Sequence, residues 1–138
     1  MIVVDTNIIC YFYLEEQYAE QTNKLLQLDP DWIVPVLWHS EFMNVLALYL
    51  QKKLLTFDKA LEILAAAEYQ MQDNEFMPSS ISIMQLVNTS NCSAYDCEFV
   101  ALAQEMNLNL LTADKRILKE FPKTAISLTD FIDSKSVN

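Results

Sequence analysis

Glycine is absent from all 138 residues of the sequence. The phosphate-binding loops of P-loop and dinucleotide-binding proteins need glycine, because only a residue without a Cβ lets the backbone approach the phosphates closely. The sequence therefore excludes both of these nucleotide-binding sites. Helix ends must also use other residues, and we expect Asn107 to take the left-handed position that glycine usually occupies there.

Histidine and cysteine are also scarce. The single histidine, His39, excludes a His-rich metal site within one chain, and its type favours a surface or structural role over catalysis or RNA contact. The three cysteines are odd in number and lack metal-ligand spacing, which indicates free thiols in a reducing compartment. No apolar run approaches the ~18 residues of a membrane span, and no basic segment precedes the first apolar stretch. We therefore expect a cytoplasmic protein with no membrane partner.

Basic residues are few: 9 Lys and Arg stand against 19 Asp and Glu, which gives a formal net charge of −10. This balance argues against a broad nucleic-acid-binding face, because such faces are basic. It permits a cluster of carboxylates around a divalent metal ion, and it equally permits a basic protein partner.

The pattern along the chain predicts alternating strands and helices. We expect one domain over residues 1–133 and a flexible tail over 134–138. Short apolar runs indicate strands at 2–4, 32–34, 75–77, 108–111 and 125–128. Amphipathic stretches indicate helices at 7–14, 15–28, 36–53, 56–70, 79–87, 93–106 and 115–121, and Thr129 is expected to cap a last turn or helix. This alternation predicts an α/β fold: a three-layer α/β/α sandwich around a central, mostly parallel sheet of four to five strands.

Four acidic residues stand at positions where a site can form. Asp5 and Asp114 each follow a buried strand, so their carboxylates meet at one edge if the two strands are neighbours in a parallel sheet. Glu41 interrupts the apolar face of the helix expected at 36–53, where an unpaired carboxylate is costly. Asp96 lies in the first turn of its helix. Converging carboxylates repel one another and raise each other's pKa, and a hard divalent cation such as Mg²⁺ or Mn²⁺ relieves that repulsion.

Each acid also has a simpler interpretation. Asp5 and Asp114 can cap the helices that follow them, and Asp96 can complete a capping box with Ser93. Glu41 can be a partly exposed acid whose head reaches solvent. Capping and metal binding are compatible, because one carboxylate oxygen can serve each.

Four motifs give the sequence a resemblance to a known family: VVDTN at 3–7, SEF at 40–42, SAYD at 93–96 with FVALA at 99–103, and LLTAD at 110–114. The sequence resembles PIN domains, and in size and layout it is similar to the VapC-type ribonuclease toxins of bacterial toxin–antitoxin pairs. The resemblance implies a metal-dependent endoribonuclease. It implies an acidic quartet of Asp5, Glu41, Asp96 and Asp114, of which Asp5, Asp96 and Asp114 would hold Mg²⁺ or Mn²⁺. By the same resemblance, Asn7 and Thr112 would orient Asp5 and the water that attacks the RNA.

The family also implies partners: RNA as substrate, a small antitoxin that keeps the toxin inactive, and a second copy in a homodimer. Aromatic residues of the first two helices are candidates for that dimer interface, namely Tyr11, Phe12, Tyr13 and Tyr18. One residue departs from the family pattern, because many relatives carry an acid where this chain has Arg116. This departure keeps open an alternative, a PIN-like binding module with weakened catalysis. A metal-dependent phosphatase or DNA nuclease is a third reading.

Four of the nine basic residues follow Asp114 closely. Lys115, Arg116 and Lys119 are candidate RNA contacts, since an acidic nuclease needs a local positive surface for phosphate. An ordinary solvated helix face is an equally good interpretation of these side chains.

Overall fold

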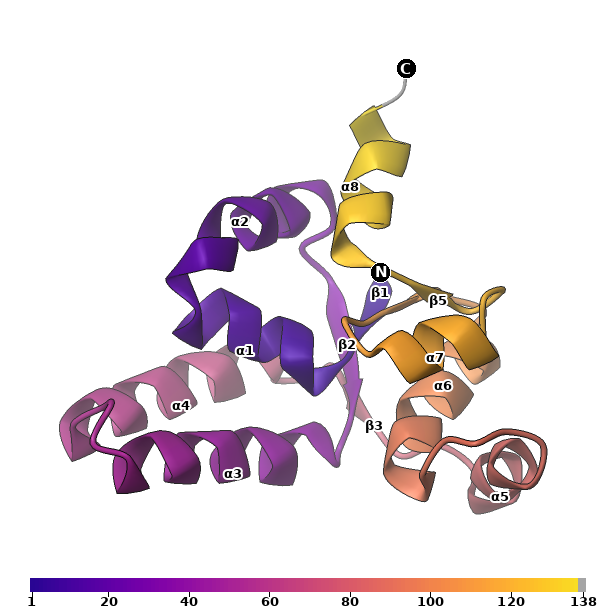
Figure 1. Ribbon diagram of the computed structural model, residues 1–138, viewed down its shortest axis with the longest axis horizontal. Coiled ribbons are helices and arrows are strands. Elements are labelled where there is room, and N and C mark those ends of the chain that lie inside the picture. Colours follow the sequence, from indigo (N-terminus) through magenta and orange to yellow (C-terminus); the bar gives the residue numbers. More distant parts are fainter. Residues whose placement is uncertain (137–138) are drawn as a thin grey trace.

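The computed structural model describes residues 1–136 and shows five strands that pair in parallel (Figure 1). Their order across the sheet is β3-β2-β1-β4-β5. The strands are β1 (Ile2–Val4), β2 (Trp32–Pro35), β3 (Glu75–Phe76), β4 (Leu110–Leu111) and β5 (Ala125–Ile126). Val3 in the central strand pairs with Ile33 on one side and with Leu110 on the other. The predicted parallel sheet of four to five strands is confirmed.

Helices flank this sheet, as the alternating pattern predicted. They are α1 (Thr6–Leu14), α2 (Ala19–Leu28), α3 (Trp38–Gln51), α4 (Phe57–Met71), α5 (Ser80–Asn88), α6 (Ala94–Met106), α7 (Lys115–Glu120) and α8 (Leu128–Ser136). In Figure 1, α1, α3 and α4 lie to one side of β2, and α5 and α6 lie to the other. Helix α8 packs against α2. None of these helices is long and apolar enough to cross a membrane.

The core lies between the sheet and its helices. The three residues of β1 are at most 1% exposed, as expected of an apolar strand covered on both faces. Helix α6 contacts β1, β2 and β4 and buries Phe99 and Val100 against them. On the other side, α4 contacts β2, and Trp38 and Phe42 of α3 are fully buried. This packing fixes the carboxyl ends of β1 and β4 relative to α3 and α6.

Several boundaries differ from the sequence-based expectation. The helix expected at 36–53 spans Trp38–Gln51, and the strands expected at 108–111 and 125–128 are shorter, Leu110–Leu111 and Ala125–Ile126. The helix expected at 15–28 begins with a short 3-10 turn, Glu16–Tyr18, and becomes α-helical only at Ala19. Helix α8 is capped by Ser127, whose Oγ accepts the N–H of Asp130 at 3.1 Å, so Thr129 lies inside the helix rather than before it. The helix also continues to Ser136, so three residues of the segment expected as a tail are helical. Residues 137–138 lie outside the described part of the chain.

Glycine is absent, and within residues 1–136 three other residues have a positive φ. Asn107 ends α6 at φ 56°, as the sequence predicted, and Lys53 and Asp73 have φ values of 59° and 70°. Asparagine and aspartate tolerate this conformation better than most residues, because their short polar side chains can bond locally. Lys53 has no such help, so the turn between α3 and α4 carries backbone strain.

The aromatic side chains expected at a dimer interface make contacts within one chain and remain partly exposed. Tyr11 stacks on Tyr18 with ring centroids 3.8 Å apart, Phe12 meets Trp32 edge to face, and Tyr13 meets Phe42 in the same way. The homodimer and its interface stay a prediction.

Candidate active site

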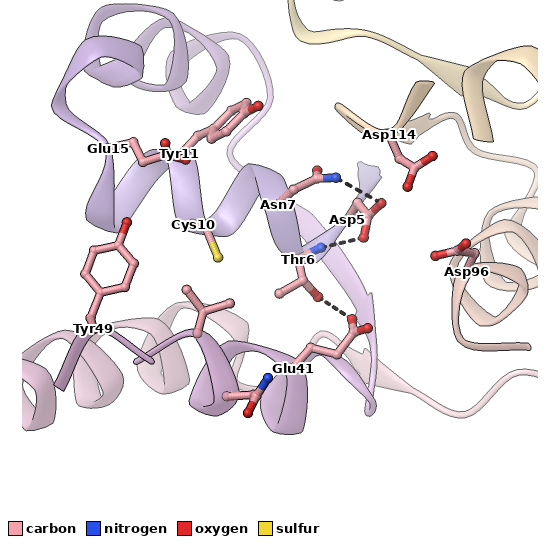
Figure 2. A pocket seen from close by; sticks show the side chains of 12 residues that line it. Asp5, Thr6, Asn7, Cys10, Tyr11, Glu15, Glu41, Tyr49, Asp96 and Asp114 are labelled. Carbon is pink, nitrogen blue, oxygen red and sulfur yellow. Dashed lines mark hydrogen bonds between the residues drawn. The ribbon is translucent and has the colours of Figure 1, made fainter. Parts of the chain in front are cut away.

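One pocket of about 480 Å³ brings the four predicted acids together (Figure 2). Asp5 follows β1 and Asp114 follows β4, and the two strands are hydrogen-bonded neighbours. Asp96 comes from the first turn of α6 and Glu41 from the first turn of α3. None of the twelve residues that line the pocket is Lys, Arg or His. Four acidic side chains from four distant parts of the chain thus line one cavity that has no basic side chain among its walls.

Asp5 is the most buried of these acids, at 8% exposed. Its Oδ2 accepts a hydrogen bond of 2.7 Å from the Thr112 hydroxyl, and its Oδ1 accepts the N–H of Thr6 at 2.8 Å. Burial nevertheless raises the pKa of Asp5 to about 7, opposed by these two hydrogen bonds and assisted by the negative charges of Glu41 and Asp96. Ionising Asp5 at neutral pH is therefore costly, and a cation in the pocket would favour the ionised form.

Asn7 and Thr112 both donate hydrogen bonds to Asp5, and their expected effect on the attacking water stays a prediction. The Asn7 amide donates to Asp5 Oδ2 at 3.4 Å, and its own oxygen accepts the N–H of Ala113 at 3.2 Å. The Thr112 hydroxyl donates to Asp5 and accepts the N–H of Asp114 at 3.0 Å. These bonds tie the end of β1 to the end of β4, so the two carboxylates keep a fixed relation.

Glu41 is half-buried beside the apolar face of α3, and not inside that face as its spacing suggested. Helix α3 buries Trp38, Phe42 and Leu46 and exposes Leu48. The Thr6 hydroxyl donates to Glu41 Oε1 at 2.7 Å. Desolvation raises the pKa of Glu41, and the Thr6 hydrogen bond partly offsets this. Sequence reasoning missed Thr6, although its place directly after Asp5 was a signal.

The capping interpretation holds for Asp5 and Asp114, and for Asp96 only the Ser93 half of the capping box forms. Asp5 caps α1, and Asp114 Oδ1 accepts the N–H groups of Arg116 and Ile117 at 2.8 and 3.0 Å. The Ser93 hydroxyl accepts the N–H of Asp96 at 3.1 Å. Since the cap at Asp114 uses only one carboxylate oxygen, the other remains for a ligand.

Comparison with known proteins identifies the family of the chain. The sequence model of the PIN domain matches residues 2–124. The chain belongs to the PIN domain family. No curated protein sequence matches it significantly.

Solved structures show the same fold at low sequence identity. FitAcB from Neisseria gonorrhoeae has a TM-score of 0.72 at 18% identity, with 94% of this chain and 99% of that one covered. PAE2754 from Pyrobaculum aerophilum has a TM-score of 0.67 at 17% identity, covering 99% and 97%. A toxin–antitoxin complex from Klebsiella pneumoniae has a TM-score of 0.68 at 15% identity, covering 93% and 98%. At these identities the likeness shows the fold.

The acids of this PIN domain suit a hydrated ion better than a closed cage. Within residues 1–136, no three His, Cys, Asp or Glu side chains form a ready-made metal site. Mg²⁺ usually keeps several waters and binds through one or two carboxylates, so a complete ligand set is not required. The donors in the pocket are carboxylate, hydroxyl and amide oxygens, which are ligands for hard cations. The donor set therefore fits Mg²⁺ or Mn²⁺.

The three basic side chains proposed as RNA contacts line a second pocket of the PIN domain. Lys115, Arg116 and Lys119 line it together with Asn91 and Glu120, and Arg116 Nη1 donates to the carbonyl oxygen of Asn91 at 3.3 Å. The two pockets adjoin at the start of α7, because Asp114 caps the helix that carries the basic residues.

His39 lies outside both pockets, where its Nε2 is 2.7 Å from an oxygen of Glu68. This pairing agrees with the surface role favoured by the sequence.

Proposed function

We propose that this PIN domain is a metal-dependent endoribonuclease that cleaves RNA phosphodiester bonds through Asp5, Glu41, Asp96 and Asp114. We further propose that it is the toxin of a type II toxin–antitoxin pair. The observation that carries the first proposal is the convergence of these four acids in a pocket whose walls contain no basic side chain. Such an arrangement costs stability unless a ligand compensates it, and locally unfavourable charge clusters are typical of catalytic sites.

In this proposal Asp5, Asp96 and Asp114 hold Mg²⁺ or Mn²⁺. When bound, such an ion polarises a phosphoryl oxygen and lowers the pKa of an attacking water. The protein's own groups do the rest. Thr112 and Asn7 hold Asp5 in place through the bonds described above. Glu41 is placed to accept a proton, because its Oε1 is held by Thr6 while its raised pKa makes the carboxylate a better base.

The toxin assignment draws on the charge of the site and on the structural neighbours. One of those neighbours is described as a toxin–antitoxin complex. An antitoxin with a basic tail would complement a pocket lined by acids, and charge complementarity of this kind favours the correct partner. We propose such an antitoxin as the protein partner, a homodimer as the assembly and the cytoplasm as the location.

The direct test is RNA cleavage with a controlled metal supply. We expect the purified protein to cleave structured RNA in Mg²⁺ or Mn²⁺ and to lose this activity in EDTA. Calorimetric titration of Mg²⁺ and Mn²⁺ provides a second readout. Cleavage that is indifferent to EDTA would contradict the mechanism.

The alternative function, a binding module with weakened catalysis, rests on Arg116 in the place of an acid. The absence of detectable binding at millimolar metal would favour it. The position of Arg116 argues the other way, because its guanidinium lies in the neighbouring pocket and not among the walls of the acidic one.

The basic pocket leads to a separate prediction about RNA affinity. We expect the double variant Arg116→Gln, Lys119→Gln to bind RNA more weakly and to flatten the dependence of log K on log salt by about one to two, since each neutralised phosphate contributes roughly 0.7 to 0.9 to the slope. Filter binding over a range of salt concentrations measures this. Lys24→Gln, at an exposed position on α2, is the control and should leave the slope unchanged. An unchanged slope in the double variant would discard the basic pocket as an RNA contact.

A further inference from the structure

The pocket continues past the four acids along α1 and α3. In Figure 2, Cys10 and Tyr49 lie between these helices, and Tyr11 and Glu15 lie above α1. We call this part the tyrosine arm. Its walls are Cys10, Tyr11, Glu15, Asn44, Val45 and Tyr49. The first three come from α1 and its C-terminal end, and the other three come from α3, which packs against α1. The proposed hydrolysis uses none of these side chains, so they are free to contact another part of the substrate.

Glu15 lines the arm at the junction of two helices. It is both the C-cap of α1 and the N-cap of the 3-10 turn Glu16–Tyr18, and its side chain makes no capping hydrogen bond to that turn. The ion pairs within residues 1–136 do not include it. Burial raises the pKa of Tyr49 and of Cys10, and the charge of Glu15 adds to both shifts. The carboxylate of Glu15 is therefore committed neither to an ion pair nor to the helix cap.

The arm presents aromatic surfaces that suit one base. Tyr11 lies six residues after Asp5 on α1, and Tyr49 lies eight residues after Glu41 on α3, which corresponds to roughly 9 and 12 Å along the helices. The orientation of the Tyr11 ring is fixed by its stacking on Tyr18. Rigid aromatic side chains of this kind stack on unpaired bases of single-stranded RNA.

From this geometry we propose that the tyrosine arm is a nucleobase pocket that selects guanine beside the scissile phosphate. The inference rests on the proposed nuclease function, because base selection presupposes an RNA strand in the pocket. Guanine presents two adjacent donors, N1–H and the N2 amino group, which match the two oxygens of the Glu15 carboxylate. Adenine and cytosine present one amino group next to an unprotonated ring nitrogen, and uracil presents one N–H between two carbonyls, so each of them pairs less well with a carboxylate.

Asn44 favours a base over a basic peptide as the occupant of the arm. Its amide offers both a donor and an acceptor, and a guanine carbonyl or ring nitrogen can accept from it. An arginine side chain has donors only, so it could use the acceptor of Asn44 but not its donor. Flat aromatic walls suit both ligands, but the mixed hydrogen-bonding capacity of the arm suits the base.

Binding of free nucleosides tests the inference without relying on cleavage. The Kd values of guanosine, adenosine, cytidine, uridine and N-acetylarginine amide are measured by NMR titration of the 138-residue protein in EDTA. We expect guanosine to bind at least about tenfold more tightly than the other nucleosides, a difference of about 1.4 kcal/mol. Glu15→Gln should remove this preference, and Tyr49→Ala should weaken every nucleoside. The matched controls are Glu16→Gln and Tyr69→Ala, two exposed positions outside the pocket, and they should change nothing.

The outcomes are separable. Equal affinity for the four nucleosides, or a guanosine preference that survives Glu15→Gln, would overturn the base pocket. Tighter, Glu15-dependent binding of N-acetylarginine amide would overturn it in favour of a peptide site. Glu15-dependent guanosine binding by a protein that cleaves no RNA would support the base pocket and contradict the nuclease proposal alone.

Discussion

Replacing Asp96 with asparagine is expected to lower RNA cleavage by roughly a thousandfold or more while the protein stays folded. Removing one carboxylate from a metal-holding set takes away charge that is needed in the transition state, and losses of this order are typical when an electrostatic contributor is deleted. Folding should tolerate the change, because the capping hydroxyl of Ser93 accepts the backbone N–H of residue 96, which the variant keeps. Single-turnover cleavage and thermal unfolding measure the two effects.

Asp130→Asn is a closely matched control for this variant. Both aspartates lie in the first turn of a helix, and each donates its backbone N–H at 3.1 Å to the hydroxyl of a serine three residues earlier. Only Asp96 lines the acidic pocket. The capping interpretation predicts equal effects of the two substitutions on stability and none on cleavage, and this result would contradict a catalytic role for Asp96.

The stability of the metal-free protein should fall as the pH rises from about 4 to about 7, and Asp5 is the cause. Its pKa is about 7 in the folded protein against 3.8 for an ordinary aspartate. Between these values the native state therefore binds more protons than the unfolded state, and the free energy of unfolding decreases with increasing pH. A shift of this size corresponds to at most about 4 kcal/mol, fully lost above the folded pKa.

The contribution of Asp5 is isolated by comparison with Asp5→Asn, which cannot ionise. We expect urea unfolding in EDTA to show the two proteins diverging as the pH rises, with the variant gaining relative to the parent. Saturating Mg²⁺ should recover stability in the parent above pH 7, because an ion that binds only the native state stabilises it by mass action. Parallel pH profiles for parent and variant would show that Asp5 ionises normally.

Much of the fold was predictable from local patterns. The apolar run at Ile2–Val4 forms the predicted strand, the helix expected at 56–70 is α4 (Phe57–Met71), and Asn107 takes the left-handed position. Boundaries were harder wherever tertiary contacts decide them. Ser127 and Thr129 are both good caps, and their sequence alone does not show which one the helix will use.

The site was predictable in part for a similar reason. Parallel strands bring their carboxyl ends to one edge, so Asp5 and Asp114 followed from topology. The rotation of α3 about its axis did not follow from topology, so the position of Glu41 beside the apolar face was not predicted. The tyrosine arm depends on α1 packing against α3, a contact that neither helix encodes alone. The separation of Arg116 from the acids is equally a matter of tertiary structure.

The central place of β1 has a consequence for how the protein is made. This first strand pairs with β2, some thirty residues later, and with β4, more than a hundred residues later. During synthesis, the surroundings of Asp5 are incomplete until Thr112 and Asp114 have been added to the chain. A nascent or prematurely terminated chain that lacks the second half therefore lacks a complete set of acids, and the pocket is complete only after Asp114 has been synthesised.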